Sequence, residues 1–170
     1  RYRYLANVFS FLSYVYYHNH KLYKKELQYF ELVNNNFPSF LNYSHSCMPS
    51  LFLISKIETS LLNNTQEVLY EENKKLFESV NWRTDTYNLP ARVNYIKYMA
   101  VSAYFSGKYK EAAKLLVTLL NETGFNDFSH IETELRLLLE LLHAHCHEFE
   151  LAWQLVRNIT RKINQLNIDG

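Results

Sequence analysis

The chain has 170 residues, of which 18 are Lys or Arg and 17 are Asp or Glu, so its net charge is +1 at pH 7. A chain this close to neutrality lacks the excess positive charge that dedicated nucleic-acid or membrane-surface modules carry. Three Gly and three Pro are too few for an all-β protein full of tight turns, whereas 48% hydrophobic residues support a large core. We therefore expect an all-α protein.

The first predicted helix, near Tyr2–His18, is apolar almost all round. Its uncharged stretch between Arg3 and His18 is 14 residues long, which is short of the roughly 20 needed to span a bilayer. A helix that is apolar on every side is usually covered on every side. We expect the cover to come from a unit upstream of this sequence or from a second copy, in a homodimer through this helix.

Three further helices are expected in the first half of the chain. The second spans about Leu22–Asn34 and ends at three consecutive Asn residues, which tolerate the geometry of a helix terminus. An irregular segment with Pro38 follows and precedes a helix from Pro49 to Leu62. The fourth helix spans about Gln66–Val80 and places Asn73 on a polar face. A loop over residues 81–89 then leads to Pro90, at the start of the fifth helix.

The central stretch, Tyr95–Glu122, predicts two helices folded back on each other at Gly107. Ala100 and Ala103 let a neighbouring helix approach closely, and Gly107 suits the left-handed conformation that ends a helix. Small residues, a turn Gly, an aromatic residue two positions later and Ala112 three after that resemble a tetratricopeptide repeat (TPR). A plain antiparallel helical hairpin is the alternative.

A single hairpin cannot cover both of its faces, so the resemblance implies neighbouring repeats. The predicted second helices align on two positions that we expect to be buried. The first position holds Tyr23, Leu69, Tyr109 and Phe149, and the second holds Phe30, Leu76, Leu116 and Val156. This alignment predicts about four antiparallel helix pairs in a single α–α superhelix over residues 1–170.

The segment Glu132–Ile163 also resembles a recurring segment of uncharacterised TPR-like proteins from Bacteroidetes bacteria. That resemblance implies the fold and a cytoplasmic bacterial setting, and it implies no activity. The last helix shows one apolar stripe, with Ala152 and Ile159 on it, which suits the end of a stack. We expect the sequence to be the C-terminal part of a longer chain, because it begins at Arg1 without Met.

No stretch carries a catalytic or cofactor motif: the sequence has no Gly-rich phosphate loop, GxSxG, HExxH or CxxC. We therefore expect a protein that is not an enzyme and holds no cofactor. His143 and His147 have the i, i+4 spacing of metal ligands, but two ligands do not make a zinc site. Histidines beside the C-terminal dipole of a helix are the alternative. We expect Cys47 and Cys146 to be buried thiols.

The face lined by the first helix of each pair is the predicted binding surface, because TPR proteins hold peptides there. We expect Asn94, Lys97, Tyr104, Glu134 and His145 to contact the ligand, and the alternative is that neighbouring helices fill this groove. The predicted function is a non-catalytic scaffold that binds a protein or peptide. The alternative is a C-terminal sensor domain of a larger transcription regulator or signalling protein. Neither nucleic acid nor membrane is an expected partner.

Overall fold

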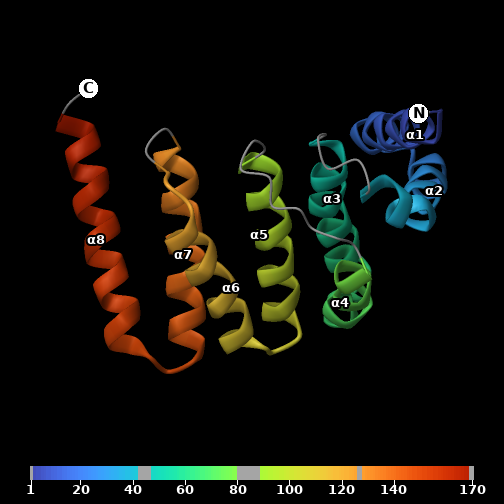
Figure 1. The fold of residues 1–170 in the computed structure, drawn as a ribbon. Coiled ribbons are helices and arrows are strands. Elements are labelled where there is room, and N and C mark those ends of the chain that lie inside the picture. The colour runs from blue at the N-terminus through green and yellow to red at the C-terminus, as the bar shows by residue number, and fades with distance from the viewer. Residues whose placement is uncertain (1, 42–46, 80–88, 126–127, 169–170) are drawn as a thin grey trace. The chain divides into compact units, whose positions relative to one another are not determined.

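The computed structural model of the protein describes residues 2–41, 47–79, 89–125 and 128–168, and every regular element in these ranges is helical (Figure 1). This confirms the all-α prediction. No helix within these ranges combines the length and the apolar character that crossing a bilayer requires. The elements are α1 (Tyr2–Asn19), α2 (Tyr23–Leu41), α3 (Met48–Leu62), the 3-10 helix η1 (Gln66–Val68), α4 (Leu69–Ser79), α5 (Leu89–Phe105), α6 (Tyr109–Glu122), α7 (Ser129–His145) and α8 (Phe149–Ile168).

The chain divides into two compact units, of which the first comprises residues 1–59 and 71–94 and the second comprises residues 60–70 and 95–170. An aromatic cluster fills the core of the first unit. The fully buried ring of Phe52 lies 5.3–5.8 Å, centroid to centroid, from those of Phe11, Phe30 and Phe37. Edge-to-face and tilted aromatic pairs of this kind hold α1, α2 and α3 together.

Helix α2 continues seven residues beyond the predicted end at Asn34, through Asn35, Asn36 and Pro38, so the predicted helix end there is wrong. The cause is the buried side of its second half, where Val33, Phe37 and Leu41 follow one another at i, i+4 and i+8. Burying each such side chain contributes about 1.5–3 kcal/mol, which together exceeds the roughly 3 kcal/mol that a Pro inside a helix costs.

The core of the second unit combines small and large side chains. Ala100 and Ala103 of α5 and Ala112 of α6 are fully buried, which lets the two helix backbones approach closely, as the sequence predicted. Leu116 and Leu135 are also fully buried, and α7 packs against both α6 and α8. Successive helices from α5 to α8 alternate in direction (Figure 1).

Four turns in the chain share one backbone geometry. Each has a residue with positive φ two positions after the last residue of a helix: Lys21 (56°), Asn64 (55°), Gly107 (72°) and His147 (60°). The N–H of this residue donates to the carbonyl three positions back, and the next N–H donates to the carbonyl five positions back. This is the Schellman arrangement, which satisfies two carbonyls that the helix end would otherwise leave free.

The four positive-φ residues join α1 to α2, α3 to η1 and α4, α5 to α6, and α7 to α8. The intervals from Lys21 to Asn64, from Asn64 to Gly107 and from Gly107 to His147 are 43, 43 and 40 residues. Positions counted from these residues therefore give a structural register for comparing the helices, which we call the turn register.

The turn register corrects the sequence alignment. Leu69 lies five positions after Asn64, so it is equivalent to Ala112, which lies five positions after Gly107. The sequence alignment had instead made Leu69 equivalent to Tyr109. The 3-10 turn η1 precedes α4 and shifts the apolar pattern by three residues. The side chain of Leu76 and the predicted loop over 81–88 lie outside the described part of the structure.

Two residues of the predicted buried series are exposed. Tyr23 and Phe149 are mostly in solvent, whereas Tyr109 is half-buried because Tyr104 and His145 cover its ring. The prediction that α8 is apolar on one stripe only is also wrong, because Trp153 is exposed on its outer side.

Both cysteine predictions fail in a similar way. Cys47 is exposed and Cys146 is partly exposed, and both thiols are free. Each lies at a helix terminus, Cys47 directly before α3 and Cys146 directly after α7, where the helix does not shield it.

The turn geometry predicts opposite effects of two substitutions. Gly107→Ala should destabilise the protein by about 1–2 kcal/mol, because a Cβ in the left-handed conformation is strained even though no atom lies within 4 Å of it. His147→Gly should stabilise it by about 0.5–1 kcal/mol by removing that strain. Thermal unfolding should show shifts of about 2–4 °C per kcal/mol in these directions.

Ala144→Gly, in the last turn of α7, is the control for the His147 substitution. It should lower the melting temperature, because Gly inside a helix costs about 1 kcal/mol relative to Ala. A lower melting temperature for His147→Gly as well would contradict the left-handed turn.

Candidate functional site

Two side-chain contacts join α5 to α7 in the second unit. Lys97 Nζ lies 2.5 Å from Glu134 Oε1, and Tyr104 Oη lies 3.1 Å from His145 Nε2. The first contact joins residues early in the two helices and the second joins residues near their ends, so α5 and α7 run in the same direction (Figure 1). Four of the five predicted binding residues are therefore brought together on one surface, which we call the α5–α7 face.

The ion pair at one end of this face is accessible to solvent. Lys97 is half-buried and Glu134 is exposed. An exposed pair of this kind contributes about 0–1 kcal/mol to folding. Its charges can therefore be redirected to a ligand at little cost in stability.

The other end of the face is an aromatic group around His145. The Tyr104 ring meets the His145 ring edge-on at a centroid distance of 5.1 Å, and the Tyr109 ring stacks on the same imidazole at 4.8 Å. His145 is nevertheless exposed. Tyr and His side chains combine apolar area with a polar tip, so this group can both pack against a ligand and exchange hydrogen bonds with it.

An apolar strip lies between these two ends. Leu137 and Leu141 are 50% and 43% exposed, and they lie between Glu134 and His145 on α7. Val101, which is half-buried, lies between Lys97 and Tyr104 on α5. Neighbouring helices therefore do not fill this part of the predicted groove. The α5–α7 face has an ion pair, an apolar strip and an aromatic–histidine group in that order.

The fifth predicted binding residue, Asn94, has a hydrogen-bond partner on another helix. It belongs to the first unit, where its Nδ2 donates to Ser50 Oγ of α3 at 3.3 Å. Because α5 continues from the first unit into the second, sequence spacing alone could not show that Asn94 is engaged elsewhere.

The two candidate metal ligands are separated by the end of α7. The ring of His143 contacts Glu148, with Nδ1 2.5 Å from Oε2. His147 occupies the left-handed turn, is exposed and lies against the Phe149 ring. The i, i+4 spacing does not bring them together because residue 147 is no longer helical. Among the described residues, no three His, Cys, Asp or Glu side chains form a group that could hold a metal ion.

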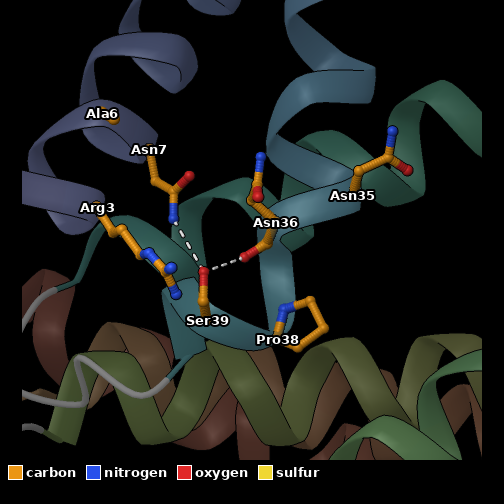
Figure 2. Close-up of a pocket in the computed structure, with 7 residues that line it drawn as sticks. All are labelled: Arg3, Ala6, Asn7, Asn35, Asn36, Pro38 and Ser39. Atoms are coloured by element: carbon orange, nitrogen blue, oxygen red, sulfur yellow. Dashed lines mark hydrogen bonds between the residues drawn. The ribbon is translucent and has the colours of Figure 1, made fainter.

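A separate polar pocket of about 510 Å³ lies between α1 and α2 in the first unit (Figure 2). Asn7 Nδ2 donates to Ser39 Oγ at 3.5 Å, and Ser39 Oγ donates to the Asn36 carbonyl at 2.8 Å. Ligand pockets are mostly apolar and enclose most of the ligand. Five of its seven lining residues are exposed and five are polar, so a small ligand there would keep much of its water, and we do not assign the site to it. Its lining residues are Arg3, Ala6, Asn7, Asn35, Asn36, Pro38 and Ser39.

Sequence reasoning missed a buried polar pair in the first unit. Lys56 Nζ donates to Asn73 Oδ1 at 3.3 Å, and both side chains are buried. Burial lowers the pKa of Lys56, while the nearby Glu72 carboxylate acts in the opposite direction. The turn register indicates that both side chains are buried, because Lys56 is equivalent to Met99 and Leu139, and Asn73 is equivalent to Leu116. Asn73 was wrongly placed on a polar face.

Comparisons with protein-family models, with curated proteins and with solved structures give no match for this chain. The resemblance to TPR and Bacteroidetes repeat proteins therefore stays a prediction from the sequence.

The buried Lys56–Asn73 pair predicts a non-additive pair of substitutions. Asn73→Leu alone should lower the free energy of unfolding by about 1–3 kcal/mol, because it removes the acceptor of a buried ammonium group. Adding Lys56→Met should restore or exceed wild-type stability, because the two positions then match the apolar Met99 and Leu116 of the α5–α6 hairpin. Urea unfolding of the three proteins at pH 7 measures this.

The pH dependence of stability tests independently whether the charged Lys56 stabilises or destabilises the fold. The folded pKa of Lys56 lies below its ordinary value of 10.5, so between these two values the unfolded chain binds more protons. The charged Lys56 therefore weakens the fold below its folded pKa, and this loss disappears as the pH rises past 10.5. The stability gap between wild type and the double variant should shrink with rising pH. A constant gap would contradict a buried, destabilised ammonium.

Proposed function

We propose that this protein is a non-catalytic helical-repeat module of the TPR type that binds a segment of a partner protein on its α5–α7 face. The observation that carries the proposal is the exposed apolar strip of Val101, Leu137 and Leu141, held between the Lys97–Glu134 and Tyr104–His145 contacts.

The repeat assignment is supported by the four equivalent turns and by the small, fully buried residues Ala100, Ala103 and Ala112 of α5 and α6. In such a repeat, the first helix of each hairpin presents one row of side chains to a ligand. Lys97, Val101 and Tyr104 form that row on α5, and Glu134, Leu137, Leu141 and His145 form it on α7.

The chemistry of the face indicates the kind of segment that it binds. Leucine and valine side chains favour an apolar anchor, whose burial supplies most of the affinity. The ion pair at one end can exchange its internal contact for a charged or polar ligand group, and the tyrosine and histidine at the other end offer stacking area and hydrogen bonds. An amphipathic peptide with apolar anchors and a polar flank satisfies all three parts.

Selection from a random peptide library displayed on phage tests the proposal without knowledge of the natural partner. Peptides enriched on the wild-type protein should contain apolar anchors. Their affinity should fall at least tenfold, about 1.4 kcal/mol, for Leu137→Asp and for Tyr104→Ala, as measured by fluorescence anisotropy.

Leu62→Asp is the matched control, because Leu62 is a more exposed leucine of the same unit and belongs to α3, not to α5 or α7. It should leave peptide affinity unchanged. Peptides whose binding is lost with Leu62→Asp but kept with Leu137→Asp would refute this site.

A further inference from the structure

Helix α1 exposes a row of large apolar side chains. They follow one another at i, i+4, i+7 and i+11, which places them along one side of the helix, and each is more than half exposed. We call Leu5, Phe9, Leu12 and Tyr16 the α1 row. A continuous exposed row of this kind marks an interaction surface rather than scattered surface residues.

The turn register shows what the equivalent positions do in later helices. Counted back from Gly107, they are Ala91, Tyr95, Tyr98 and Ser102 of α5, which are all less than one-tenth exposed. Counted back from His147, they are Ile131, Leu135, Leu138 and Leu142 of α7, of which none is exposed and two are fully buried. The α1 row is thus the counterpart of rows that α5 and α7 bury.

The cover of the α7 row comes from the preceding two helices. Glu134 and His145 lie on the same side of α7 and contact Lys97 and Tyr104 of α5, and Tyr109 of α6 stacks on His145. This side of α7 therefore faces α5 and α6. The α7 row is adjacent to Glu134 and His145 on the helix surface, so it also lies toward the preceding hairpin.

Helix α8 exposes the complementary surface. Phe149 and Trp153 are equivalent in the turn register to Tyr109 and Ala113 of α6, at the side where α6 receives α7. Both are more than half exposed, whereas Ala113 is buried. The guanidinium of Arg157 lies over the Trp153 ring at 5.3 Å and forms a polar edge to this patch, which we call the α8 patch.

We propose that two copies of the chain associate head to tail, with the α1 row of one copy packed on the α8 patch of the other. This contact repeats the packing of α7 on α6, and it uses two different surfaces. A homodimer through α1 alone would instead place two first helices against each other, which is not how the α7 row is covered. The contact leaves one α1 row and one α8 patch open, so further copies can add.

Two single variants and their mixture test this arrangement by light scattering after size exclusion, over a range from micromolar to submillimolar protein. Wild type should exceed the mass of one chain as concentration rises. Leu12→Glu and Trp153→Glu should each remain a single chain, because each lacks one of the two surfaces. Their equimolar mixture should form a complex of two chains and no larger species, because one competent contact remains.

Phe9→Glu and Phe149→Glu form a second pair in case either first variant does not fold, which circular dichroism will show. Leu62→Glu, at another exposed leucine, should associate like wild type. A wild type that stays a single chain at submillimolar concentration overturns the proposal. So does association that survives Trp153→Glu, which would indicate contact between two α1 rows, and so does a mixture that stays monomeric.

Discussion

The fold depends on a residue that can hold the left-handed conformation two positions after the last residue of a helix. At Lys21, Asn64, Gly107 and His147, this conformation turns the chain while two backbone N–H groups satisfy carbonyls of the last helical turn. Those carbonyls would otherwise need water or a side chain. Only one of the four residues is glycine, and at Lys21 and His147 the left-handed backbone costs about 1–2 kcal/mol, which the two hydrogen bonds of each turn help to offset.

The same constraint sets which side chains share a surface. Because α2, α6 and α8 each begin two residues after the positive-φ residue of their turn, positions counted from the turns can be compared between hairpins. Lys97 and Tyr104 thereby meet Glu134 and His145, and the apolar strip between them remains exposed. The register also identifies departures from the pattern, such as the polar Lys56–Asn73 pair at positions that are apolar in the α5–α6 hairpin.

Much of this could be predicted from the sequence, and the failures have physical causes. The turn at Gly107 was predicted because glycine favours the left-handed conformation, whereas nothing in the residue type of His147 indicates the same conformation there. At Asn34 and Pro38 the local signals for a helix end are overruled by the burial of the residues that follow. Four residues of the α5–α7 face were predicted because helical spacing is reliable along one helix. The hydrogen bond from Asn94 to Ser50 was not predicted, because spacing does not show the partner that a neighbouring helix supplies.

Backbone torsion angles at the three turns without glycine test the central claim most directly. Nuclear magnetic resonance of the labelled protein gives φ from the coupling and the intraresidue cross-peak between the amide proton and Hα, and from the Cα and Cβ chemical shifts. Lys21, Asn64 and His147 should each show positive φ near the left-handed value of about 57°. A negative, helical φ at His147 or Asn64 would show that the turns are not equivalent, and the register built on them would fail.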